Sequence, residues 1–196
     1  IAIAKGKRIK YIPTIEQIRK VIFSLPSDTE IEKLYQALIA FTILTGARDL
    51  AIATLKIKHV DIQRRLVTQD PKDGVKTKKG KLIYTKFFPI GKDIEEIIIN
   101  WVKFLKEDKL YSVTDPLFPR IKLGHDKNFS FEAQGLEPIH WTTASQIRKI
   151  FKSSFERFNL PYFNPHSFRD TINEIGKNSC NIAQYKAWSQ NLGHEK

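Results

Sequence analysis

The sequence lacks several features that would assign it to common classes of protein. Its 196 residues contain no methionine and a single cysteine, Cys180, which excludes an internal disulfide and a cysteine-based zinc site. No apolar run approaches the roughly 20 residues that a membrane-spanning helix needs, and the N-terminus does not have the pattern of a signal peptide. We therefore expect a cytoplasmic protein without a membrane partner, in which Cys180 is a buried or unreactive thiol.

Acidic residues are few relative to basic ones. Lys and Arg number 33 against 21 Asp and Glu, so the formal net charge is +12 and the isoelectric point is about 9.7. An excess of this size indicates a polyanionic partner, first nucleic acid and second an anionic membrane, while the plainer interpretation is a contribution to solubility. The acidic residues form no cluster of the kind that two-metal nucleases use, so a site of that kind is not expected.

The spacing of apolar residues favours helices. Thr14 and Gln17 have the spacing of a capping box at the start of a first helix, and Asp28 is expected to cap a second helix, which Gly46 ends as a C-terminal glycine. Further helices are expected over residues 48–55, 92–107, 143–158, 166–177 and 181–191. Because 41% of the residues are hydrophobic, these helices can share a buried core.

The middle of the chain changes its period. Residues 66–69 and 82–88 are rich in β-branched and aromatic residues, which predicts a small antiparallel sheet with a basic hairpin tip between its strands. Residues 111–141 are interrupted by proline and glycine and are expected to form an irregular loop. We predict one mainly α domain with a small antiparallel β-sheet over residues 12–196, preceded by a basic linker arm over residues 1–11.

Two motifs near the C-terminus carry residues suited to phosphate chemistry. Residues 164–171 read NPHSFRDT, with His166 and Arg169 three positions apart, a spacing that puts two side chains on one face of a helix. Residues 191–194 read NLGH and end in His194. A histidine moves protons near neutral pH and a guanidinium group binds two phosphate oxygens, so the first motif predicts a phosphate site, although a capping histidine beside a surface arginine has the same pattern.

Three weaker signals are basic residues. Arg48 follows Thr45-Gly46-Ala47 at the start of a predicted helix, where backbone N–H groups favour an anion; a solvated surface arginine is the commoner outcome. The predicted hairpin tip carries Lys76, Lys78, Lys79 and Lys81, for which an ordinary charged turn is the alternative. The helix over 143–158 carries Arg148, Lys149 and Lys152 opposite its apolar face, as phosphate contacts or as a solvated face.

Taken in order, these motifs resemble the tyrosine recombinases, the phage-integrase family. The resemblance extends over essentially residues 12–196 and corresponds to that family's catalytic domain, without its N-terminal core-binding domain. It implies the DNA breaking-rejoining fold and an activity in DNA recombination and integration of a mobile element. It also implies double-stranded DNA and other recombinase protomers on DNA as partners, no cofactor, and a location at the nucleoid.

The resemblance implies roles for individual residues. The residues that surround the scissile phosphate would be Arg48, Lys76, His166, Arg169 and His194. A tyrosine attacks the DNA, leaves a 3′-phosphotyrosyl intermediate, and is displaced by the 5′ hydroxyl of a second strand. Arginines stabilise the charge on the non-bridging oxygens, the lysine protonates the leaving oxygen, and the histidines accept the nucleophile's proton and contact the phosphate. The implied DNA contacts are Lys78, Lys79, Lys81, Arg148, Lys149 and Lys152.

Three positions depart from the family's pattern. Ala51 stands where the family usually has a glutamate, Lys78 rivals Lys76 as the catalytic lysine, and the chain ends two residues after His194, before a nucleophilic tyrosine is reached. We therefore expect the tyrosine beyond residue 196 and interpret the chain, which starts without methionine, as a piece of a longer protein that binds DNA without cleaving it. The alternatives are a degenerate recombinase that only binds DNA and a type IB topoisomerase.

Overall fold

The structure, a computed structural model, describes residues 11–125 and 131–193, so residues 1–10 of the predicted arm lie outside it. The helices are α1 (Ile15–Ser24), α2 (Glu30–Thr45), α3 (Asp49–Ile52), α4 (Lys92–Lys103), α5 (Ser145–Glu156), α6 (Ser167–Ser179) and α7 (Ile182–Asn191). The strands are β1 (Val60–Asp61), β2 (Leu66–Gln69), β3 (Ile83–Lys86), β4 (Arg120–His125) and β5 (Phe131–Glu137). Short 3₁₀ turns are η1 (Ile57–His59), η2 (Pro71–Asp73) and η3 (Lys78–Gly80).

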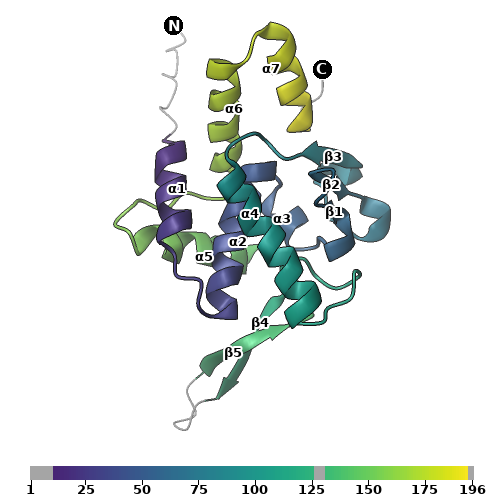
Figure 1. Ribbon diagram of the computed structural model, residues 1–196, viewed down its shortest axis with the longest axis vertical. Coiled ribbons are helices and arrows are strands. Elements are labelled where there is room, and N and C mark those ends of the chain that lie inside the picture. Colours follow the sequence, from purple (N-terminus) through teal and green to yellow (C-terminus); the bar gives the residue numbers. More distant parts are fainter. Residues whose placement is uncertain (1–10, 126–130, 194–196) are drawn as a thin grey trace, which may run out of the picture.

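Helix α2 lies at the centre of the core, because its sequence is apolar on nearly every side. All of its residues from Ala37 to Thr45 are buried, and α1, α4, α5 and α6 pack around it (Figure 1). The two buried hydroxyl groups, of Thr42 and Thr45, donate to the carbonyls of Leu38 and Phe41 at 2.7 Å, so their polar hydrogens are satisfied. Burying each large apolar side chain stabilises the fold by roughly 1.5–3 kcal/mol.

Capping side chains decide where the first two helices begin. At α1 the Thr14 hydroxyl accepts the Gln17 backbone N–H and the Gln17 side chain accepts the Thr14 N–H, as predicted. At α2 the prediction of Asp28 as the cap is wrong, because Thr29 is the N-cap residue and its hydroxyl accepts the Glu32 N–H. Thr29 and Glu32 form a reciprocal pair of hydrogen bonds, which Asp28 cannot form because the residue three positions after it is apolar.

The predicted small sheet is present and has one more strand. Strand β2 lies between β1 and β3, and both pairings are antiparallel. The prediction of an irregular loop over residues 111–141 is wrong, because β4 and β5 within it form an antiparallel hairpin that projects from the body of the molecule (Figure 1). Its strands alternate polar and apolar residues over 120–123 and 131–134, but the glycines within them, Gly124 and Gly135, and the nearby prolines indicated a loop.

The remaining elements differ from the predictions mainly in length. Helix α3 covers only the middle of the predicted 48–55 range, and α4 ends at Lys103 and continues as a π-helical turn over Phe104–Asp108. Helices α5, α6 and α7 match their predicted ranges to within a few residues, and α6 and α7 form a hairpin at one end of the molecule (Figure 1). The prediction of a mainly α fold with a small antiparallel sheet is therefore confirmed.

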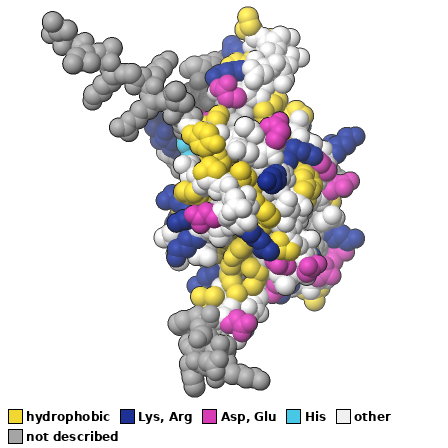
Figure 2. Space-filling view, turned by 90° about the vertical axis from the view of Figure 1, so that its left-hand side faces the viewer, with side chains coloured by type: hydrophobic (Ala, Val, Ile, Leu, Met, Phe, Trp, Pro, Cys, Tyr) yellow, Lys and Arg dark blue, Asp and Glu magenta, His cyan; other side chains and the backbone are white. Residues whose placement is uncertain are grey.

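The surface carries basic and acidic side chains together on the face that contains α1. On this face, Lys and Arg side chains are interspersed with Asp and Glu around hydrophobic side chains (Figure 2). Positive charge is therefore not concentrated there. Cys180, at the C-terminal end of α6, is partly exposed rather than buried. None of the helices in the described ranges has the length and hydrophobicity needed to cross a membrane.

Candidate active site

Arg169 is buried near the start of α6 and joins three segments of the chain. The residue is only 6% exposed, its Nη1 donates to the carbonyl of Gly46, and its Nη2 donates to the carbonyl of Leu192. Gly46 lies two positions before Arg48, and Leu192 lies one before Gly193. One guanidinium group therefore brings together the three arginine and histidine motifs that the sequence analysis identified.

Arg169 remains protonated although it is buried. Burial first, and the neighbouring charge of Arg48 second, lower the pKa of Arg169 to about 10, so the guanidinium stays protonated at neutral pH. A buried cation that another cation destabilises is stabilised when an anion binds between them. The pair formed by Arg48 and Arg169 is therefore suited to a phosphate group.

Gly46 allows the end of α2 to approach the end of α7. Its φ of 58° lies in the left-handed region, and a Cβ atom there would lie 2.7 Å from Leu192 Cδ2 and 3.1 Å from Ile172 Cδ1. Both distances are shorter than an ordinary carbon–carbon contact of roughly 3.5–4.0 Å. A glycine is thus required both by the backbone conformation and by the space beside Arg169.

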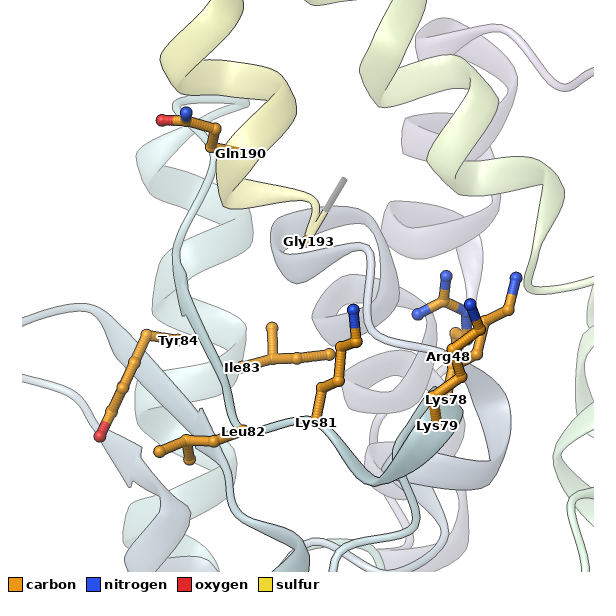
Figure 3. A pocket seen from close by; sticks show the side chains of 9 residues that line it. All are labelled: Arg48, Lys78, Lys79, Lys81, Leu82, Ile83, Tyr84, Gln190 and Gly193. Atoms are coloured by element: carbon orange, nitrogen blue, oxygen red, sulfur yellow. The ribbon is translucent and has the colours of Figure 1, made fainter. Parts of the chain in front are cut away.

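A pocket of about 410 Å³ lies next to Arg48, between the lysine-bearing segment (residues 74–81) and the end of α7 (Figure 3). Its lining residues are Arg48, Lys78, Lys79, Lys81, Leu82, Ile83, Tyr84, Gln190 and Gly193. In Figure 3 Arg48, Lys78 and Lys79 line one side of the pocket, and Lys81 extends from the segment that leads into β3. None of these lining residues is acidic, so the pocket gathers four positive side chains and favours an anion.

The turn at η3 determines which lysines line the pocket. Lys79 and Gly80 both have a positive φ, of 60° and 62°, and the Thr77 hydroxyl closes the turn by donating to the Lys81 carbonyl at 2.7 Å. Lys76 precedes this turn; it is exposed and is not among the residues that line the pocket. Of the two rival lysines from the sequence analysis, the structure brings Lys78 to Arg48.

His166 lines a second pocket, to which Asp49 at the start of α3 also contributes. This pocket, of about 490 Å³, is lined by Asp49, Arg148, Tyr162, Asn164, Pro165 and His166. Asp49 directly follows Arg48, so consecutive residues at the start of α3 line the two pockets. The turn before α6 is fixed by Asn164, whose side chain and carbonyl both accept hydrogen bonds from Ser167. His194 lies outside the described residues.

The three basic residues predicted on α5 share its exposed face. Arg148, Lys149 and Lys152 are exposed, opposite the buried Ile147 and Ile150. Arg148 forms an ion pair with Asp49, with 2.7 Å between Nε and Oδ2, and Lys152 forms a longer pair of 3.8 Å with Glu156. Part of the positive charge on this face is therefore balanced within the protein.

Two tyrosines line the pockets, and the structure favours neither as the nucleophile. Tyr84 lines the lysine pocket, but its side chain points away from Arg48 and Lys81 in Figure 3. Tyr162 lines the second pocket, where burial, as the largest cause, raises the pKa of its phenol and disfavours the phenolate. Tyr185 joins two helices, because its hydroxyl on α7 donates to Asn173 Oδ1 on α6 at 2.7 Å.

The sequence analysis missed side chains that shape the site. The Asn191 side chain accepts the Lys86 backbone N–H at 2.7 Å and donates to the Lys86 carbonyl at 2.8 Å, which fixes the last turn of α7 to the edge of β3. No local pattern identifies this contact, because the two residues are 105 positions apart. Helical spacing could have identified Gln190 as a pocket residue, because it lies one turn before Gly193 on the same side of α7. Within the described ranges, no three His, Cys, Asp or Glu side chains are grouped so as to hold a metal ion.

Comparisons with known proteins identify the fold. No protein-family model and no curated protein sequence matches the chain. Solved structures do: XerA recombinase aligns with a TM-score of 0.64 at 15% identity, over 100% of this chain and 63% of that protein. The integrase from mycobacterium phage Brujita aligns with a TM-score of 0.60 at 12% identity, over 97% of this chain and 51% of that protein.

A third similar structure is a complex with DNA. It is a substituted fragment of the Tn1549 transposon integrase bound to a circular intermediate DNA, with a TM-score of 0.61 at 15% identity, over 99% of this chain and 61% of that fragment. The chain therefore has the fold of the catalytic domain of tyrosine recombinases, as the resemblance implied. It spans between half and two thirds of the length of the three matched chains.

Proposed function

We propose that the chain is the catalytic domain of a site-specific DNA recombinase of the tyrosine type, which integrates DNA of a mobile element. The observation that carries this proposal is the buried Arg169, whose two backbone contacts join the Arg48 segment to the Leu192-Gly193 segment. The recombinase and integrase folds that the chain shares support the same reaction class. Its substrate is double-stranded DNA, and its partners are further protomers on that DNA.

The two arginines act on the transferred phosphate. Negative charge grows on the non-bridging oxygens in the transition state, where Arg48 and Arg169 donate hydrogen bonds, and losing one such donor typically costs roughly 3–4 kcal/mol of barrier. Arg169 has five N–H groups, and one on Nη1 and one on Nη2 donate to the carbonyls of Gly46 and Leu192. These carbonyls orient the guanidinium group, and in this proposal its other N–H groups donate to the transferred phosphate.

Proton transfers are divided between the two pockets. Lys78, which lines the pocket beside Arg48, protonates the 5′ oxygen as it leaves, in place of the Lys76 that the motif alone favoured. A lysine suits this step because its ammonium group can donate a proton to the leaving oxygen. His166, which lines the second pocket, accepts the proton of the attacking tyrosine. His194 contributes a hydrogen bond to the phosphate.

The nucleophile in this proposal is a tyrosine beyond residue 196. The covalent 3′-phosphotyrosyl link conserves the energy of the phosphodiester, so the 5′ hydroxyl of a second strand can displace it without a cofactor. DNA is held mainly through phosphates by the pocket lysines and by Arg148, Lys149 and Lys152. A footprint of 6–10 phosphates predicts that affinity falls roughly 10³–10⁵-fold between 50 and 200 mM salt.

The test is capture of a covalent DNA adduct. The 196-residue chain and the protein extended through the codons that follow Lys196 are incubated with nicked duplexes of random sequence, and adducts that survive SDS are recovered and sequenced. We expect adducts on a common DNA sequence from the extended protein only, and a loss of roughly 10²–10³-fold in rate with Arg48→Ala.

Other outcomes refute the proposal in different ways. An extended protein that binds DNA in a salt-dependent manner and forms no adduct is a DNA-binding module. An adduct formed by the 196-residue chain itself would mean an internal nucleophile, which Tyr84→Phe and Tyr162→Phe would then identify. A lack of any DNA binding contradicts both the recombinase and the binding module.

A further inference from the structure

Asp73, at the end of η2, accepts hydrogen bonds from three cationic or polar side chains. Its Oδ1 accepts the Lys56 ammonium at 2.7 Å, and its Oδ2 lies 2.7 Å from both the Lys58 ammonium and His59 Nε2. The Lys56 ammonium also donates to the Asp73 backbone carbonyl at 2.9 Å. All three partners belong to one short segment at η1, so both the side chain and the backbone of Asp73 are attached to it.

The buried ring of His59 makes this attachment rigid. The side chain of His59 is only 4% exposed, and its Nδ1 accepts the Lys56 backbone N–H at 2.9 Å. The ring proton is therefore on Nε2 and is donated to Asp73. Burial, the largest cause, lowers the pKa of His59, and the hydrogen bonds of Lys56, Lys58 and His59 hold the pKa of Asp73 well below its usual range. The group thus persists as a carboxylate held by a neutral imidazole and two ammonium groups at neutral pH.

Asp73 lies immediately before the lysine-bearing segment, residues 74–81. Gly74 follows with a φ of 90°, which turns the chain, and the buried Val75 donates its N–H to the Asp70 carbonyl at 3.1 Å. The Lys76 N–H then donates to the Thr54 hydroxyl at 2.9 Å. The start of the segment is therefore fixed to the protein body, and its other end is fixed where β3 pairs with β2.

We propose that Asp73 is a positioning residue, which fixes residues 74–81 so that Lys78, Lys79 and Lys81 face Arg48 across the phosphate pocket. The inference rests on the proposed function, since it assigns those lysines to DNA. Charge-assisted hydrogen bonds to a carboxylate are about twice as strong as neutral ones, and three of them from one segment restrict the direction of the chain that leaves Asp73. A loosened segment would move its lysines into solvent and away from Arg48.

The test compares Asp73→Asn with Asp61→Asn in the 196-residue chain. Asp61 is the control, because it lies on β1, outside residues 74–81 and their attachment, and its ion pair with Arg64, 3.7 Å long, is exposed. Both substitutions remove one negative charge, so simple electrostatics predicts slightly tighter DNA binding for both. Positioning predicts the opposite sign for Asp73→Asn alone, and this separates it from a general effect of charge.

Two measurements are made on each variant. Hydrogen exchange of the amides of residues 74–81 should accelerate in Asp73→Asn and stay unchanged in Asp61→Asn. The salt dependence of affinity for a random-sequence duplex should become shallower in Asp73→Asn by about 1–3 in the slope of log K against log salt, because each lost phosphate contact removes about 0.9. Circular dichroism at the same temperature confirms that both variants are folded.

Each result supports or overturns the inference. Unchanged exchange in residues 74–81 overturns it, whatever the DNA data show. Faster exchange with an unchanged salt slope overturns it as well, because the attachment would then serve stability alone. If the unsubstituted chain shows no salt-dependent DNA binding, the proposed function fails, while the exchange data still report whether Asp73 fixes the segment. Faster exchange together with a shallower slope supports the inference.

Discussion

Replacing Gly46 by alanine should destabilise the protein through two separable effects. The φ of 58° costs a residue with a Cβ atom roughly 1–2 kcal/mol. The new Cβ would lie 2.7 Å from Cδ2 of Leu192, which is itself 2% exposed and has little room to move, and such overpacking typically costs roughly 1–3 kcal/mol. Together these give a loss of roughly 2–5 kcal/mol in the free energy of unfolding.

Gly80→Ala is the control, because Gly80 has nearly the same φ, 62°, and nothing lies within 4 Å of its Cβ position. For a domain of this size each kcal/mol lowers Tm by roughly 2–4 °C. Gly46→Ala should therefore lower Tm, followed by circular dichroism, by roughly 4–20 °C, and Gly80→Ala by roughly 2–8 °C. Equal changes in the two variants would refute the close approach of α2 and α7 at Arg169.

Three further predictions concern the lysine segment and α7. Lys78→Ala should lower the slope of log K against log salt for DNA binding by about 1 and Lys76→Ala by less, measured by fluorescence anisotropy. The reverse order would favour Lys76 as the lysine that contacts the phosphate. The depressed pKa of Asp73 contributes stability that is present above about pH 4 and lost as pH falls, so urea midpoints should fall less on acidification in Asp73→Asn than in the unsubstituted chain. Asn191→Ala should lose roughly 0.5–1.5 kcal/mol per hydrogen bond and speed amide exchange in α7; unchanged exchange would contradict the contact with β3.

Local rules predicted the parts of this fold that depend on neighbouring residues. The capping box at Thr14 and the glycine stop at Gly46 follow from short-range hydrogen bonds and backbone sterics. The β4–β5 hairpin was not predicted, because the prolines and glycines around and within it outweighed the short alternation of polar and apolar residues over 120–123 and 131–134. Strand pairing there comes from the partner strand and not from the strand's own composition.

The site was predictable in its motifs and not in its geometry. Helical spacing placed His166 and Arg169 on one face, but α6 begins at Ser167, so His166 is an exposed cap residue while Arg169 is buried in the helix. The attachment of Asp73 to His59 joins residues 14 positions apart in turns of irregular conformation. No periodic rule relates such positions, and only the tertiary structure brings them together.

The most direct test of the central claim is a crystal structure of the chain bound to duplex DNA. We predict one backbone phosphate within hydrogen-bonding distance of both Arg48 and Arg169, with the ammonium group of a lysine from residues 78–81 at the adjacent 5′ oxygen. DNA bound on another face, with no phosphate in contact with either arginine, would contradict the claim that the scissile phosphate binds at Arg48 and Arg169, beside the lysine-lined pocket.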